Sequence, residues 1–228
     1  MKVVYDLAIV GLGHTEKSLR TGVFRYAHEL AMALVDREDV FVEFAATRYV
    51  HLARTALSEI AKLRGSPLVR PSYAHLRSSL LPLLESERLS LPKRSSKLGT
   101  MDVLSLHLCI HLLRKLLPKF APPVAPQTLS EASIFHSPWF GFPPDLPRRK
   151  RLHRFLSILD LIPIRFPHLF SGEEEMELRR KIARLEPEDF LVCISSNTRE
   201  DLLNFRSKLD PTRVFVTYPG VSDRFDPE

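Results

Sequence analysis

The sequence predicts an α/β protein built on one doubly wound, mostly parallel sheet. Short apolar runs alternate along the chain with stretches of helical periodicity, which is the order of a βαβ protein. The apolar runs are nearly continuous, as in strands that are covered on both faces of a parallel sheet. The length of 228 residues suits one large domain. We therefore expect a Rossmann-like single domain over residues 1–218.

Composition and charge narrow the class of protein. Hydrophobic residues make up 44% of the chain and charged residues 26%, which is typical of a soluble globular protein. The net charge of +6 favours anionic partners: nucleic acid, an acidic membrane surface or phosphorylated small molecules. Cys109 and Cys193 each lie in an apolar run, so we expect buried thiols and no disulfide framework. Neither a signal peptide nor a membrane-spanning run is apparent, and we expect a cytoplasmic protein.

The first 47 residues read as a strand, a loop, a helix and a second strand. Residues 3–10 form an apolar run that ends in Gly11-Leu12-Gly13, and residues 40–47 supply the second strand. Between them a helix is expected after Thr21, which is a suitable N-cap residue. Its apolar face is formed by Val23, Ala27, Leu30, Ala31, Leu34 and Val35.

Further elements follow the same alternation. We expect a helix over 50–64, an irregular or helical insertion over about 65–130, and within it a helix over 101–117 that ends before Pro118. The remaining predicted strands lie in residues 132–137, 153–164, 190–195 and 214–218. Helices are expected over 173–185 and up to Phe205, the second opened by a capping box of Asn197 and Glu200.

The loop after the first strand is a candidate phosphate site. Gly11 and Gly13 have the spacing of a dinucleotide fingerprint, but Glu16 stands where its third glycine belongs, and no P-loop sequence is present. The helix start at Thr21-Gly22, with His14, Lys17 and Arg20 nearby, nevertheless offers free N–H groups to an anion. The alternative is a surface loop with solvated charges.

Four later segments stand in order where predicted strands end: FHSPWFGFP, FLSILDLIPIRFPHLF, VCISSNTREDLLNF and RVFVTYPGVSDRF. Together with the first strand and the Thr-Gly-x-x-Arg-Tyr sequence at residues 21–26, they resemble the N-terminal half of family 4 glycosyltransferases of the GT-B fold. The resemblance covers the chain except for roughly residues 50–130. It implies a retaining enzyme of polysaccharide biosynthesis that moves a sugar from a nucleotide-sugar, which is a substrate and not a cofactor, to a glycan or lipid-linked acceptor.

The resemblance also implies roles for individual residues. Asp160 matches the family's catalytic Asp in His-Asp-Leu, but Leu159 replaces the His and cannot hydrogen-bond to the sugar. The hinge to the next domain corresponds to Gly220, where unusual backbone angles would permit motion. Substrate-binding positions are expected at Gly11, Gly13, His14, Thr21, Gly22, His136, Trp139, Ser195 and Arg199.

Four of these positions also have a structural alternative. Asp160 could cap the loop after its strand, and Ser195 could cap a turn or helix. Arg199 could be a surface charge, and Trp139 could cover the edge of the core. The residues alone do not decide between the two roles.

In the GT-B family a second domain binds the donor. We therefore expect residues 219–228 to begin an interdomain linker, the C-terminal donor-binding domain to be the main partner, and the chain alone to be inactive. Two other kinds of protein remain as alternatives: a non-catalytic binding or scaffold module, and a nucleic-acid-binding α/β protein. We expect no nucleic-acid partner, because no recognised module accompanies the basic residues.

A dense basic cluster lies between two predicted strands. The cluster could attract anionic lipid headgroups or a phosphorylated lipid acceptor, which would place the protein at the inner face of the membrane, or it could be solvated loop charge. It consists of Arg148, Arg149, Lys150, Arg151 and Arg154. Elsewhere, His107 and His111 are one helical turn apart, but no third ligand accompanies them and no metal is expected.

Overall fold

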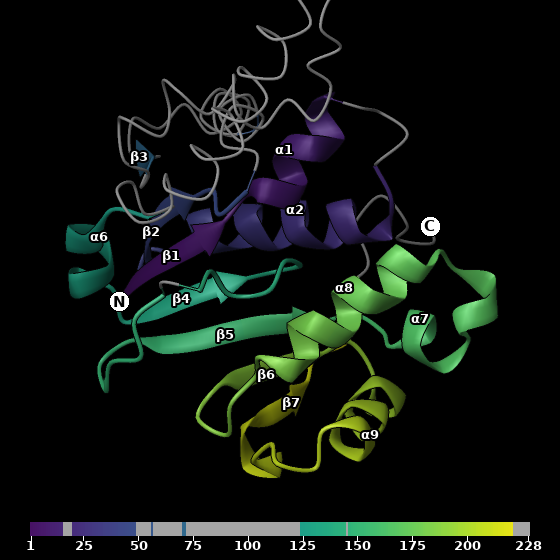
Figure 1. The fold of residues 1–228 in the computed structure, drawn as a ribbon. Helices are drawn as coiled ribbons and strands as arrows, with labels where there is room; N and C mark the ends of the chain where they lie inside the picture. The colour runs from purple at the N-terminus through teal and green to yellow at the C-terminus, as the bar shows by residue number, and fades with distance from the viewer. Residues whose placement is uncertain (16–19, 49–55, 57–69, 72–123, 145, 221–228) are drawn as a thin grey trace, which may run out of the picture.

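A computed structural model describes residues 1–15, 20–48, 56, 70–71, 124–144 and 146–220. Within these ranges, seven strands form one sheet in the order β3-β2-β1-β4-β5-β6-β7, and every neighbouring pair is parallel (Figure 1). The predicted α/β class with a Rossmann-like parallel sheet is therefore confirmed.

The strands are short and the helices between them mostly longer. The strands are β1 (Lys2–Asp6), β2 (Phe41–Ala45), β3 (Arg70–Pro71), β4 (Ile134–Ser137), β5 (His153–Ile158), β6 (Phe190–Cys193) and β7 (Val214–Val216). The helices are α1 (Ala8–Thr15), α2 (Gly22–Val35), α6 (Pro126–Glu131), α7 (Ile162–Arg165), α8 (Gly172–Ala183) and α9 (Ser196–Phe205). The 3₁₀ turns η2 (Pro167–Leu169) and η3 (Pro211–Arg213) complete the described elements. No described helix has both the length and the apolar character needed to cross a bilayer.

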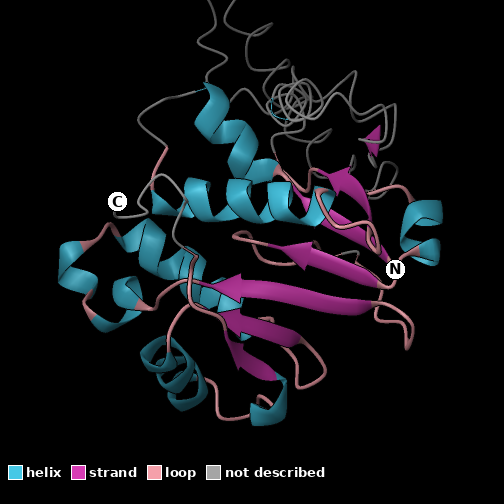
Figure 2. Ribbon diagram, turned by 180° about the vertical axis from the view of Figure 1, so that it is seen from behind, coloured by secondary structure: helices cyan, strands magenta, loops and turns pink. Residues whose placement is uncertain are grey.

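Both faces of the sheet are covered, because successive side chains of a strand point to opposite faces. On β1, Val4 belongs to one apolar cluster that also contains Ile182 of α8 and Leu202 of α9. Its neighbour Tyr5 belongs to a second cluster, with Phe24 of α2. Figure 2, seen from behind, shows the strands side by side with helices on either side of them. The sheet is therefore doubly wound, and the direction of winding reverses between β1 and β4.

The first strand is shorter than predicted, and the expected glycine loop begins as a helix. β1 ends at Asp6 instead of Val10, because the Asp6 carboxylate accepts a hydrogen bond from the Ala8 N–H at 3.1 Å and turns the chain. Gly11 and Gly13 then lie inside α1. Glycine costs about 1 kcal/mol in a helix. At Gly13 the packing of α1 against α2 nevertheless requires glycine, because an added Cβ would lie 2.1 Å from Cδ2 of Phe24 in α2.

The later elements follow the predictions closely, with two differences. Residues 153–164 do not form one strand into a loop, since β5 ends at Ile158 and the chain then forms the single turn α7. The expected capping box of Asn197 and Glu200 is wrong, because Ser195 is the N-cap of α9 and accepts from the Thr198 N–H. The predicted helix over 101–117, and that over 50–64 apart from Ala56, lie outside the described residues.

Candidate functional site

The carboxyl ends of the parallel strands form one edge of the sheet, and this edge carries the candidate site. In doubly wound sheets, ligands bind outside these ends at the point where the winding reverses, here between β1 and β4. The segments after β4, β5, β6 and β7 all reach the same edge, because these strands are adjacent and parallel. We refer to it below as the carboxyl edge.

A buried carboxylate organises the carboxyl edge at β1. Asp6 is 1% exposed and accepts from the N–H groups of Ala8 and Thr47, both at 3.1 Å, as well as from the Thr47 hydroxyl. Burial raises the pKa of Asp6, and the hydrogen bonds from Thr47 oppose that shift. Asp6 therefore joins the ends of β1 and β2 to the start of α1. The sequence analysis did not identify Asp6, and its place inside an apolar run is the signal that could have done so.

The N-terminus of α2 is open. Thr21 is the N-cap residue, as predicted, and its backbone is extended, but its side chain makes no capping hydrogen bond. Gly22 follows as the first helical residue, and an added Cβ there would meet nothing within 4 Å. The first N–H groups of a helix have no partner inside it and carry the positive end of the dipole. Of the expected phosphate-binding positions, Thr21 and Gly22 are the two that lie exposed at such a terminus.

The other described residues of the expected phosphate loop make packing contacts, and Lys17 lies outside the described residues. The His14 ring lies edge-on to Phe24 of α2, with centroids 5.5 Å apart. Arg20 donates from Nε to the Gly13 carbonyl at 3.0 Å, where it satisfies an acceptor at the end of α1. Gly11 is buried within α1, and Gly13 lies against Phe24. Contacts that hold α1 on α2 therefore account for Gly13, His14 and Arg20.

A part-buried polar chain connects α2 to the middle of the sheet. The Tyr26 hydroxyl lies 2.9 Å from Ser157 Oγ on β5, and the same Oγ lies 2.9 Å from His136 Nε2 on β4. Burial lowers the pKa of His136 to about 4, so its imidazole is neutral at physiological pH. Sequence analysis named His136 as a substrate contact but did not identify Tyr26 or Ser157. Their contacts fix the first turns of α2 over β4 and β5.

Trp139, after β4, is in contact with a lysine of α8. Lys181 Nζ donates to the Trp139 carbonyl at 2.5 Å and lies 4.8 Å from the centre of the indole ring. Burial lowers the pKa of Lys181 to about 8, and the nearby carboxylates of Asp160 and Glu177 oppose that shift. One face of the expected sugar-stacking ring is thus engaged by the ammonium group.

The ends of β5 and β6 are joined by a second set of hydrogen bonds. Asp160 is partly exposed, and its Oδ1 accepts from the Ile162 N–H at 3.0 Å, which starts α7. Ser195 Oγ caps α9 by accepting from the Thr198 N–H at 3.1 Å. The Thr198 hydroxyl donates in turn to the Leu159 carbonyl at 3.1 Å. The capping alternatives considered for Asp160 and Ser195 therefore describe real contacts.

Arg199 and Gly220 are two further expected site residues whose surroundings the structure describes. Arg199 donates from Nε to the Val214 carbonyl at 2.9 Å and from Nη2 to the Pro211 carbonyl at 3.0 Å, so its guanidinium supports the start of β7. Gly220 is exposed with open space around it, but its φ lies outside the left-handed region. The left-handed conformation that favours glycine is therefore not used at this expected hinge position.

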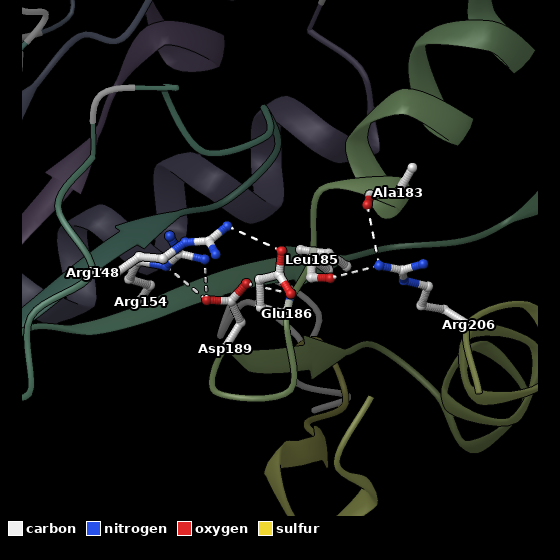
Figure 3. Close-up of polar contacts among 7 residues, drawn as sticks. All are labelled: Arg148, Arg154, Ala183, Leu185, Glu186, Asp189 and Arg206. Atoms are coloured by element: carbon white, nitrogen blue, oxygen red, sulfur yellow. Dashed lines mark hydrogen bonds and ion pairs between the residues drawn. The ribbon is translucent and has the colours of Figure 1, made fainter. Parts of the chain in front are cut away.

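The basic cluster divides into a buried part and an exposed part. Arg154 is only 7% exposed and pairs through Nε with Asp189 Oδ1 at 2.7 Å (Figure 3), which corrects its assignment to a membrane-binding surface. Arg148 pairs with Glu186 at 3.2 Å. The exposed remainder, residues 149–151, precedes β5 and thus lies at the amino edge, opposite the carboxyl edge.

The described residues contain no group of three side chains with metal-ligating character. His107, His111 and Cys109 lie outside them. Cys193 is buried at the end of β6, where burial raises its pKa to about 12, so it is an inert thiol.

Fold and site together define a doubly wound α/β domain with a Rossmann-like parallel sheet and a candidate ligand site at the carboxyl edge. Models of known protein families give no match to the sequence. A search of curated proteins finds no significant relative.

Proposed function

We propose that this chain is the acceptor-side domain of a retaining GT-B glycosyltransferase of the family 4 type. The observation that supports this most strongly is the position of the four family-like segments, which follow the adjacent strands β4, β5, β6 and β7 at one edge of the sheet. The open N-terminus of α2 is connected to β4 and β5 at that edge through Tyr26. An edge that bears an anion-binding helix terminus and a carboxylate suits a phosphorylated or nucleotide-linked sugar.

In this proposal few residues contact the substrate. The N–H groups at Gly22 and Val23 bind a phosphate of the lipid-linked acceptor or of the donor. Asp160, held through Oδ1 by the Ile162 N–H, stabilises the positive charge that develops on the transferred sugar. The acceptor hydroxyl attacks from the face that the nucleotide diphosphate leaves, and the second GT-B domain supplies the groups that hold this diphosphate.

The remaining family positions act through the fold. His136, Trp139, Ser195 and Arg199 position the strand ends through their contacts with Ser157, Lys181, Thr198 and backbone carbonyls. Such a domain works in the cytoplasm, and at the inner face of the membrane when its acceptor is lipid-linked.

The activity test compares this chain alone with the chain plus a GT-B donor-binding domain encoded in or beside its reading frame. Radiolabelled nucleotide-sugars and polyprenyl-phosphate or glycan acceptors are the substrates. We expect no sugar transfer by residues 1–228 alone, transfer by the combination, and its loss in Asp160→Asn. Robust transfer by the chain alone contradicts the division into two half-sites.

A binding test addresses the N-terminus of α2 directly. Gly22→Pro removes one free N–H at a position where proline fits a helix, and Thr21 before it is already extended. The matched control is Gly172→Pro, the same change at the first residue of α8, where the N-cap Ser171 is also extended and the site is equally open. We expect Gly22→Pro to weaken binding of farnesyl phosphate several-fold and Gly172→Pro to leave it unchanged, as measured by amide chemical shifts. Equal effects of the two variants contradict a phosphate site on α2.

A further inference from the structure

The hydroxyl group of Tyr26 lies at the carboxyl edge, close to the point where the winding of the sheet reverses. Its oxygen is 2.9 Å from Oγ of Ser157, which is the last residue but one of β5. The same Oγ is 2.9 Å from Nε2 of His136 on β4, the strand next to β1. Side chains of a helix lean towards its N-terminus, so the Tyr26 ring covers the first turn of α2. The three groups therefore form a chain that begins on β4 and ends beside the start of α2.

The serine in the middle limits this chain to two directions. Ser157 is 0% exposed, and its hydroxyl has one proton and no further partner among the described residues. That proton therefore goes either to His136 or to Tyr26. If it goes to His136, Tyr26 has to donate to Ser157, and its own proton is used within the chain. If it goes to Tyr26, His136 donates from Nε2, and the Tyr26 proton is left for a group outside the chain.

The surroundings of the imidazole favour the second direction. A neutral imidazole carries one N–H, and Nδ1 of His136 has no hydrogen-bond partner among the described residues. Burial lowers the pKa of His136 to about 4, so the ring is poorly solvated. A proton on Nδ1 would lack an acceptor there, and unpaired buried N–H groups are rarer than unpaired acceptors. With the proton on Nε2, the ring donates to Ser157 and the chain runs from His136 to Tyr26.

We propose that Tyr26 is a phosphate-binding residue, whose O–H donates to a phosphate oxygen at the carboxyl edge. Hydrogen bonds in a chain strengthen one another, so donation from His136 through Ser157 makes the Tyr26 hydroxyl a better donor. Burial raises the pKa of Tyr26, and the phenol therefore keeps its proton at neutral pH. An ionised acceptor such as a phosphate forms the strongest hydrogen bond with a donor of this kind.

This role of Tyr26 rests on the proposed function and deepens it. The phosphate site proposed above uses only main-chain N–H groups at the start of α2. Tyr26 adds a side-chain donor that is fixed to the ends of β4 and β5. The phosphate belongs either to a lipid-linked acceptor or to a nucleotide diphosphate, and two probes distinguish these sources.

The direction of the chain is tested first, in the absence of ligand. Long-range nitrogen–proton NMR spectra of residues 1–228 at pH 7 distinguish the two tautomers of a neutral histidine. We expect the Nε2–H form for His136. The Nδ1–H form overturns the proposal, because Ser157 would then donate to His136 and accept the Tyr26 proton.

Binding is measured by amide chemical shifts, with farnesyl phosphate and with uridine diphosphate as probes. We expect Tyr26→Phe to weaken binding of the tighter probe about tenfold, as for a lost hydrogen bond to a charged group. Ser157→Ala keeps the Tyr26 hydroxyl and removes only its polarisation, so its loss of affinity is smaller. The matched control, Tyr218→Phe, removes the hydroxyl of a tyrosine that is 72% exposed after β7, and binding is unchanged. Circular dichroism verifies that the variants fold.

The outcomes separate this inference from the proposed function. Equal losses in Tyr26→Phe and Ser157→Ala overturn the role of Tyr26 as a donor, since they show that it only holds α2 on the sheet. Unchanged binding in Tyr26→Phe overturns it as well and leaves the phosphate site on α2 intact. No binding of either probe by the wild type rejects the phosphate site and the role of Tyr26 together.

Discussion

The missing side chain at Gly13 sets how closely α1 and α2 pack. We expect Gly13→Ala to lower the free energy of unfolding by about 1–3 kcal/mol, because the new methyl group would overlap Phe24. Gly22→Ala is the control, since the same methyl group has open space at the start of α2. Urea denaturation measures both. A Gly13→Ala protein as stable as the control would show that Phe24 is not a fixed neighbour.

The ion pair of Arg154 and Asp189 is the clearest electrostatic contact in the described core. Arg154→Met leaves the Asp189 carboxylate buried without its partner, so we expect a loss of about 3–5 kcal/mol in the free energy of unfolding. Arg148→Met removes an exposed pair with Glu186, and we expect at most about 1 kcal/mol. If the free energy of unfolding falls by the same small amount in both variants, Arg154 is not buried as described. The double variant Arg154→Met/Asp189→Leu should recover part of the loss.

His136 makes stability depend on pH. Its pKa is about 4 in the folded protein against 6.5 ordinarily, so between these values the unfolded chain binds a proton that the folded protein does not. The contribution to stability is complete above pH 6.5 and is lost as the pH falls towards 4. We expect the free energy of unfolding to fall less over this window in His136→Gln than in the wild type. The His136 ring resonances should report a neutral imidazole at pH 5, and a charged ring at that pH would contradict the lowered pKa of His136.

At the scale of elements, the two helix starts α8 and α2 differ in their caps. Ser171 and Glu174 form a reciprocal capping box at α8, whereas the Thr21 side chain makes no capping hydrogen bond at α2. We expect Ser171→Ala to cost about 1 kcal/mol of unfolding free energy and Thr21→Ala to cost less. Thermal unfolding followed by circular dichroism compares them. Equal losses would indicate that Thr21 caps α2 in solution.

At the scale of the whole molecule, the two edges of the sheet carry different groups. Residues 149–151 lie at the amino edge, and the N-terminus of α2 lies at the carboxyl edge. We therefore expect charge reversal of Arg149, Lys150 and Arg151 to glutamate to leave farnesyl phosphate binding within about twofold at physiological salt, where charges farther apart than a Debye length are screened. Titration by amide chemical shifts measures it. A large loss of affinity would place the phosphate site at the amino edge.

The sequence by itself determined the class of fold and the order of its elements. Continuous apolar runs such as residues 190–195 predict buried parallel strands, and the acidic start and basic end of α8 predict a helix, because both signals are local. Local signals also placed Thr21 at the N-cap of α2, whereas His136 and Asp160 were named from the segments that resemble the glycosyltransferase family.

Only the tertiary structure decided which of these residues are available to a ligand. The local pattern of Gly11 and Gly13 indicates a loop, whereas both residues lie inside α1, where Gly13 is packed against Phe24 of α2. Arg154, Trp139 and Arg199 look like free binding groups in the sequence. Their partners are Asp189, Lys181 and two backbone carbonyls. A hydrogen bond or ion pair between residues far apart in the chain leaves no local pattern, so the occupied and the open parts of the carboxyl edge could be distinguished only in the folded molecule.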